Sequence, residues 1–342
     1  MDMSKTVKLI ALLLLAGGML TGCNKIGLGG GGKVVFVASS ESSATRTSYS
    51  GVVDSDTKIE RIDWVAKDKI TIWSDKARNT DNQPSADYEV GTITTSGSIS
   101  KASVTSVDAN GLQWGNDPAG TDYVFYGRYP ADATKIDGTS MTGTIPATQK
   151  LTWDGLVGKP DMQYAFMFAK TTAEVNAESV ILEFNPKFTA FEFVIGGGSS
   201  DAITVNLSSF ALSAPSAISG GFTVACSSGA VTATGTDAAS KSIALDFSDL
   251  TGGVLPVTGD DELTVTLLAV APASLPNLTL TITGDKIGTR VLKLQDKNGQ
   301  WIPFAGGKKY RITGLNLPEL LNVTGKNIDW DIEALLEPMI WD

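Results

Sequence analysis

The stretch Leu263-Thr264-Val265-Thr266-Leu267 places an apolar residue at every second position, with a threonine in each gap. Successive side chains of a β-strand point to opposite faces, so this alternation is typical of a strand with one buried face. Leu278-Thr279-Leu280-Thr281-Ile282 has the same pattern further along the chain. The two stretches therefore predict β-structure that packs a core on one side.

Similar short runs fill the chain from Lys33 onward, separated by Gly, Asp, Asn, Pro and Ser. Many short strands with turn residues between them indicate β-sandwiches, so we predict an all-β fold. No segment has a convincing helical stripe of apolar residues, and Ile332–Leu336 comes nearest to one. The predicted strands are Val34–Ala38, Lys69–Trp73, Asp122–Tyr129, Tyr164–Ala169, Ser179–Phe184, Phe188–Ile195, Ala202–Leu207, Ser242–Phe247, Leu263–Val270, Leu278–Thr283, Arg290–Leu294 and Lys309–Thr313.

The length and composition suit a globular chain of two domains. The 342 residues are 42% hydrophobic and 19% charged, and domains are commonly about 100–150 residues long. The polar stretch Lys170–Glu178 precedes a new pair of strongly apolar strands. We therefore predict tandem sandwich domains over residues 33–178 and 179–342. Within the second, Lys297-Asn298-Gly299-Gln300 is a hairpin-turn signal.

Charge and missing residue types exclude several functions. The net charge of -10 disfavours nucleic-acid binding, because phosphates would be repelled. The chain has no His, the commonest general base and metal ligand, so an enzyme is the least favoured class, and we predict no cofactor. Two acidic stretches are candidate calcium ligands, but neither has the EF-hand pattern. We interpret both as turns whose carboxylates are solvated. These stretches are Asp54-Ser55-Asp56 and Asp260-Asp261-Glu262.

The N-terminus has the parts of a secretory signal. Lys5 and Lys8 precede the apolar run Leu9–Ala16, which is too short to span a bilayer. Leu20-Thr21-Gly22-Cys23 then resembles the bacterial lipobox, in which the Cys is lipidated and the chain is cut just before it. Residues 1–22 are thus predicted to be a lipoprotein signal peptide. Residues 23–32, rich in Gly, are predicted to be the lipidated Cys and a flexible tether.

The other cysteine, Cys226, has no free partner if Cys23 is acylated. It lies in the strand-like run Phe222–Cys226. We interpret it as a small buried hydrophobic residue rather than a reactive thiol.

Four stretches together resemble the fimbrillin-like (Mfa/FimA-type) lipoproteins of Bacteroidetes. The first is a lipobox and strand followed by Ala44-Thr45-Arg46-Thr47-Ser48-Tyr49. The second is Ile62-Asp63-Trp64-Val65-Ala66-Lys67-Asp68-Lys69-Ile70. The third is Phe184–Phe193, where Asn185-Pro186-Lys187 departs from the His often found in the family. The fourth is Phe304–Thr313, followed by a late Trp330.

This resemblance implies two transthyretin-like β-sandwich domains and a role in surface pili. Precursors of the family travel to the cell outer membrane as lipoproteins. In polymerising members, a protease cuts after an Arg beyond the first strand, and a strand from the next subunit fills the groove. Other members stay lipidated as anchors or cap the tip. The implied partners are the outer membrane, through lipid on Cys23, and other pilus subunits.

The chain contains matching parts for this mechanism. Lys33–Ser39 is the candidate removable strand, with Val35 and Val37 on one face and Val34 and Phe36 on the other. Arg46 is the first basic residue after it, and either a cleavage site or an ordinary surface residue fits its pattern. The C-terminal stretch Leu321–Asp342 either supplies the donor strand or completes the second sandwich.

A second function class is a surface module that binds a glycan or host protein without polymerising. Most of the seven Trp residues fit core or sheet-edge packing. Trp114 and Trp153 lie in polar Gly/Asp-rich loops and are the candidate ligand contacts.

Overall fold

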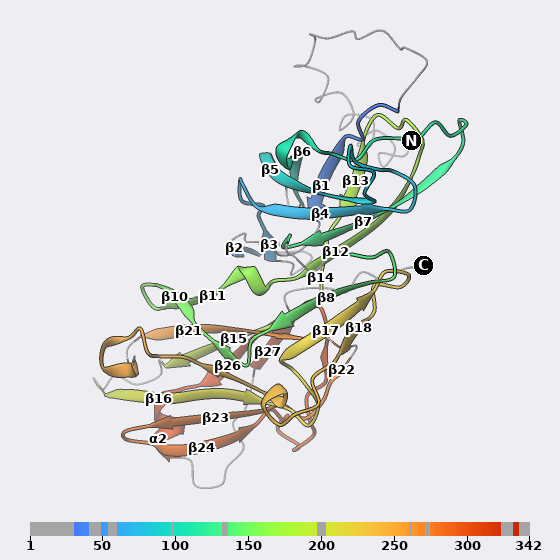
Figure 1. The fold of residues 1–342 in the computed structure, drawn as a ribbon. Coiled ribbons are helices and arrows are strands. Elements are labelled where there is room, and N and C mark those ends of the chain that lie inside the picture. Colours follow the sequence, from blue (N-terminus) through green and yellow to red (C-terminus); the bar gives the residue numbers. More distant parts are fainter. Residues whose placement is uncertain are drawn as a thin grey trace, which may run out of the picture. The chain divides into compact units, whose positions relative to one another are not determined.

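Strands make up nearly all of the regular structure, which confirms the predicted all-β class. The computed structural model describes residues 31–40, 49–53, 60–96, 99–131, 136–196, 203–259, 261–270, 272, 274–322 and 331–334. The fold is shown in Figure 1. Several predicted strands have almost the observed bounds; Asp122–Tyr129, for example, is strand β7.

The largest sheet has the strand order β13-β1-β6-β5-β4-β7-β12-β14. Its two end strands, β13 and β14, are separated in the chain only by Phe184. The sheet therefore curves until its ends are joined by one continuous segment. The bounds are β1 Phe36–Ser40, β4 Lys69–Ser74, β5 Ser85–Ser96, β6 Ile99–Ser106, β7 Asp122–Tyr129, β12 Met167–Glu174, β13 Val180–Glu183 and β14 Asn185–Pro186.

Two six-stranded sheets contain most of the later strands. The first, ordered β10-β11-β21-β15-β26-β27, consists of β10 Leu151–Asp154, β11 Val157–Pro160, β15 Phe188–Gly196, β21 Glu262–Val270, β26 Lys309–Leu315 and β27 Asp331–Ala334. The second runs β24-β23-β16-β19-β9, with β20 also on β16. It consists of β9 Thr148–Gln149, β16 Thr204–Ser213, β19 Ser242–Leu245, β20 Leu255–Thr258, β23 Thr279–Gly284 and β24 Gly288–Lys293.

Smaller elements complete the described fold. A three-stranded sheet has the order β18-β17-β8, and two two-stranded sheets pair β2 with β3 and β22 with β25. These strands are β2 Tyr49–Val53, β3 Glu60–Ile62, β8 Ser140–Ile145, β17 Gly220–Ala225, β18 Val231–Ala233, β22 Ser274–Leu275 and β25 Phe304–Ala305. The helical elements are η1 Val107–Ala109, η2 Met162–Tyr164, η3 Ala239–Lys241, η4 Thr251–Gly253 and α2 Leu317–Asn322.

The residues from Gly31 onward form one compact unit with two buried apolar clusters. Strand β15 contributes to both: Phe188 and Ala190 join the first cluster, whereas Phe191 and Phe193 join the second. A strand buried on both faces explains why this run is almost continuously apolar. The proposed boundary between residues 178 and 179 stays a prediction.

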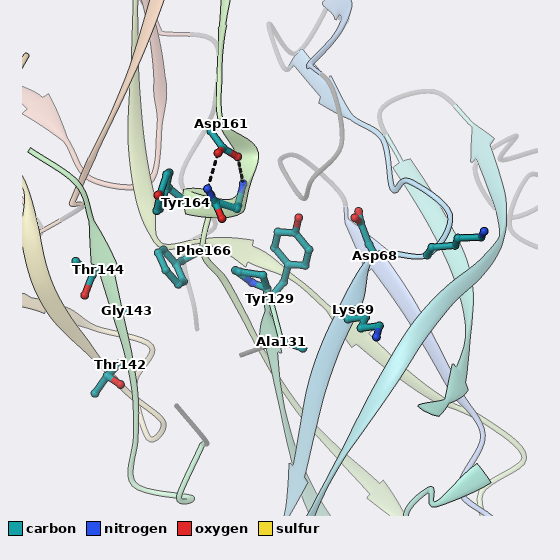
Figure 2. A pocket seen from close by; sticks show the side chains of 13 residues that line it. Asp68, Lys69, Tyr129, Ala131, Thr142, Gly143, Thr144, Asp161, Tyr164 and Phe166 are labelled. Atoms are coloured by element: carbon teal, nitrogen blue, oxygen red, sulfur yellow. Dashed lines mark hydrogen bonds between the residues drawn. The ribbon is translucent and has the colours of Figure 1, made fainter. Parts of the chain in front are cut away.

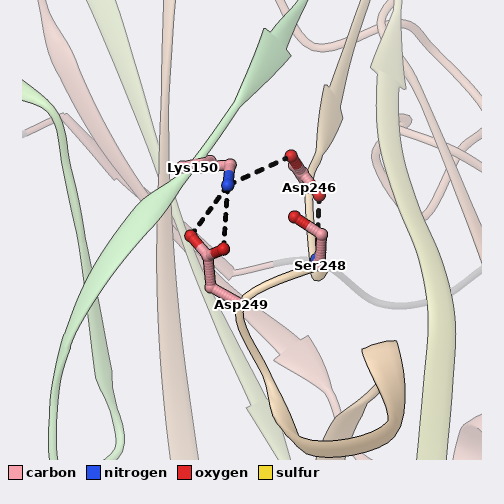
Figure 3. Close-up of polar contacts among 4 residues, drawn as sticks. All are labelled: Lys150, Asp246, Ser248 and Asp249. Carbon is pink, nitrogen blue, oxygen red and sulfur yellow. Dashed lines mark hydrogen bonds and ion pairs between the residues drawn. The ribbon is translucent and has the colours of Figure 1, made fainter.

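Strands from before that boundary pair with strands after it. Strand β8 pairs with β17 and β11 with β21 (Figure 1). Strand β9 pairs with β19. The buried side chain of Gln149 adds to this join, because its amide donates to the Leu268 carbonyl at 2.6 Å and accepts from the Leu268 N–H at 3.0 Å. Lys150, next in the chain, pairs with Asp249 at 2.8 Å and lies 3.7 Å from Asp246 (Figure 3).

Near the C-terminus the structure shows one short helix and one further strand. The described helix of this region is the six-residue α2, which begins Leu317-Pro318, and proline suits a first helical turn. The stretch with the nearest helical spacing instead contains strand β27, which pairs antiparallel with β26. Its pairing shows that Asp331–Ala334 lies within a sheet of its own chain.

In the Trp64–Ile70 motif, the Trp64 side chain packs in the core and the residues after it form a turn. Trp64 is buried and packs edge-on against Tyr129 and Phe184. The Asp68 carboxylate accepts from the Val65 N–H at 3.3 Å, and its backbone N–H donates to the Val65 carbonyl at 3.1 Å. The carboxylate therefore fixes the turn that leads into β4.

Candidate functional site: the first strand and its groove

Strand β1 lies inside the large sheet rather than at its edge. It pairs parallel with β13, from Phe36 opposite Val180 to Ser39 opposite Glu183. On its other side it pairs antiparallel with β6, from Val37 opposite Ser103 to Ser40 opposite Ser100. Figure 1 shows these segments side by side although they are far apart in sequence. Removing β1 would leave both neighbours with unpaired N–H and C=O groups.

The side chains of β1 alternate as the sequence predicts. Val34 and Phe36 are buried, whereas Val35 is 54% exposed. Phe36 lies edge-on to Tyr88 and Phe125, with ring centroids 5.2 Å apart in each pair. The groove that β1 fills is therefore lined with aromatic rings, and the strand holds its place by apolar packing as well as by backbone hydrogen bonds.

The residues just before β1 are also held. The Val34 N–H donates to the Leu112 carbonyl at 3.0 Å, and the Trp114 N–H donates to the Gly32 carbonyl at 3.0 Å. Backbone hydrogen bonds therefore hold the chain from Gly32 to Ser40. Residues 41–48, which follow, lie outside the described residues.

The four residues predicted as sites have different outcomes. Cys23 and Arg46 lie outside the described residues, so lipidation and cleavage stay predictions. Trp114 is 4% exposed and packs edge-on against Tyr123 and Phe125. The polar residues around Trp114 in the sequence did not indicate this burial. A ligand contact has to lie on the surface, and the Trp114 ring lies in the core. Trp153 lies half-buried on β10 and packs on the second apolar cluster.

The other candidates are structural in the described part of the chain. Cys226 is a buried free thiol, as predicted, and burial raises its pKa to about 11. Asp54-Ser55-Asp56 and Asp260 lie outside the described residues, while the Asp261 carboxylate accepts from the Thr258 hydroxyl at 2.8 Å. No group of three metal-binding side chains occurs among the described residues. Within that same part, no helix has the length and hydropathy to cross a membrane.

Lys187 is one of several buried charged residues that sequence reasoning missed. Lys187 follows β14 and is 8% exposed, with its ammonium nitrogen 5.8 Å from the centroid of the Phe168 ring. No ion pair with Lys187 is found within the described part of the chain. Desolvation by burial lowers the pKa of Lys187 to about 8, because the charged form loses water without gaining a carboxylate.

This burial predicts a stabilising substitution. The folded-state pKa lies below the unfolded value, so the folded protein binds the Lys187 proton less tightly and stability rises between about pH 8 and pH 10.5. Lys187→Met is therefore expected to raise the free energy of unfolding at pH 7 by up to about 3 kcal/mol, and the gain disappears near pH 10.5. Urea unfolding at both pH values measures this. Lys101→Met, at an exposed lysine of β6, controls for loss of a surface charge; equal effects of the two substitutions would refute the argument.

The fold and the site together define a class: an all-β chain whose first strand is embedded between two later strands of one sheet. Comparison with known proteins then identifies the family. A fimbrillin-like family model matches residues 45–330, and the chain belongs to this family. No curated protein matches the chain.

Two solved structures to which the chain is similar come from Bacteroides and Parabacteroides. A proposed cell adhesion protein from Bacteroides uniformis is 16% identical, with a TM-score of 0.49 over 89% of this chain and 98% of that one. A fimbrial assembly protein from Parabacteroides distasonis is 11% identical, with a TM-score of 0.43 over 89% of this chain and 96% of that one.

Proposed function

We propose that the chain is a structural or adhesive subunit, or the anchor, of a pilus assembled by strand exchange. It reaches the outer membrane as a lipoprotein acylated on Cys23. The observation that carries this proposal is the position of β1, which is paired on both sides and packed by Phe36 into an aromatic groove. Family membership supports the same role.

The proposed mechanism depends on the groove that remains in the large sheet when β1 is removed. A cut after Arg46 ends the covalent link between β1 and the rest of the fold. The neighbouring strands β6 and β13 then offer two rows of unpaired backbone groups above an apolar trench. A strand from another subunit supplies hydrogen bonds and alternating apolar side chains to both, which makes the exchange favourable.

The alternative, a stand-alone module that binds a glycan or host protein, has less support. Of its two candidate contacts, Trp114 is buried in the core. Trp153, with part of its ring accessible, is the remaining one.

The experiment uses the lipid-free protein and an Arg-specific protease. Wild-type protein is expected to form SDS-resistant ladders after cleavage, whereas Arg46→Ala stays monomeric. Intact mass of the cell-surface protein shows whether the mature chain begins at acylated Cys23 or at Thr47. Wild-type protein that is cut after Arg46 and remains monomeric contradicts the polymerising function.

A further inference from the structure

The buried face of β1 changes from a large side chain to small ones along the strand. Phe36 is 2% exposed, Ala38 is 0% exposed and Ser40 is 2% exposed. Residues two apart on a strand line the same face, so these three side chains enter the groove one after another. The groove therefore holds one aromatic ring followed by two small side chains.

Ala38 lies between two buried residues of the neighbouring strands. Its register partner on β6 is Ala102, which is 1% exposed, and its partner on β13 is Leu182, which is 0% exposed. All three belong to the first apolar cluster. Protein interiors are packed about as densely as organic crystals, and extra methylene groups in such a core force strained side chains or backbone shifts. At this position the groove therefore fits a methyl group or less.

The position of Phe36, two residues earlier, has the opposite requirement. Tyr88 and Phe125 both pack edge-on against the Phe36 ring. A small side chain there would lose these contacts and leave a cavity, which is costly in a close-packed core. The two positions thus select side chains of opposite size.

The outer face of β1 imposes no such limit. Val35 is 54% exposed, and Ile181 of β13, the register partner of Val37, is 45% exposed. Backbone hydrogen bonds to β6 and β13 are available to any extended segment without proline. The buried face is therefore what distinguishes one incoming strand from another.

We propose that the groove of β1 selects an extended segment in which an aromatic residue is followed, two positions later, by alanine or glycine. This inference rests on the proposed strand exchange and names the chemistry of the partner, which is a subunit strand with this size pattern. A strand with a second large residue at the position of Ala38 has the required alternation, but the groove rejects it by overpacking.

The first part of the test uses the intact, uncut chain, so that it does not depend on exchange. Ala38→Leu is expected to lower the urea midpoint of unfolding by about 0.5–1 M, because the longer side chain overpacks the groove. Val35→Leu adds the same kind of side chain to the exposed face of the same strand. Its midpoint is expected to change by less than about 0.2 M.

The second part measures selection of the incoming strand. Wild-type protein cut after Arg46 is mixed with a fluorescent, blocked peptide that has the sequence of residues 33–40, and incorporation is followed by anisotropy. The peptide with Ala38→Leu is expected to bind about tenfold more weakly or worse. The peptide with Val35→Leu stays within about twofold of the wild-type peptide.

The outcomes separate this inference from the exchange itself. Equal binding of the Ala38→Leu and wild-type peptides, or an unchanged urea midpoint for the Ala38→Leu protein, would overturn the size selection while leaving the exchange in place. Failure of the cut protein to take up even the wild-type peptide, with Ala38→Leu still destabilising the uncut chain, would contradict the exchange. The selection of a partner would fall with it.

Discussion

Glu192→Ala is expected to lower the free energy of unfolding by about 3–5 kcal/mol, because it removes a buried carboxylate that pairs with a buried ammonium group. Glu192 on β15 is 8% exposed, and Lys309 on the neighbouring strand β26 is 2% exposed. Their charged atoms are 2.5 Å apart, and Arg311 donates to the other Glu192 oxygen at 2.6 Å. Urea unfolding of the intact protein measures the loss.

Two variants separate the ion pair from the loss of a side chain. Glu183→Ala removes an exposed glutamate of β13 and is expected to change stability by less than about 0.5 kcal/mol. The double variant Glu192→Leu with Lys309→Met replaces both buried charges by apolar groups and is expected to recover most of the loss. A cost below about 1 kcal/mol for Glu192→Ala would show that Lys309 does not depend on this carboxylate.

The strands were the most predictable part of this fold, because their signal is local. Alternation marks both a strand and its buried face, as in Leu263–Val270, observed as β21 Glu262–Val270. The partner of each strand is set by contacts between distant residues, so the pairing of β8 with β17 and the position of β1 between β6 and β13 needed the structure.

The site residues were less predictable, for a related reason. The polar neighbours of Trp114 indicate a loop, but the ring turns inward onto Tyr123 and Phe125. Lys187 gives no sequence signal for burial, because lysine is normally exposed. The alternating faces of β1 could be predicted, since Val34 and Phe36 differ from Val35 by the period of the strand alone.

Phe36→Asp is expected to abolish stable folding of the large sheet, whereas Val35→Asp is tolerated. Loss of a buried Phe side chain costs about 3–5 kcal/mol, and burying an unpaired carboxylate adds to that cost. The total approaches the whole free energy of unfolding of a typical domain, which is roughly 5–15 kcal/mol. Val35, the adjacent residue of the same segment, is 54% exposed, so its substitution is expected to cost less than about 0.5 kcal/mol. Circular dichroism and urea unfolding distinguish the two variants.

This pair of variants also bears on how the subunit exchanges strands. If β1 is integral to folding, the uncut chain must fold around it first, and its groove opens only after cleavage. The segment that replaces β1 must then place an apolar side chain where Phe36 lies against Tyr88 and Phe125. A blocked peptide with the sequence of residues 33–40 is expected to suppress ladder formation by cleaved protein, and the same peptide with Asp at position 36 is expected to have no effect. Equal suppression by both peptides, or a well-folded Phe36→Asp protein, would mean that the groove does not select its occupant by this buried face.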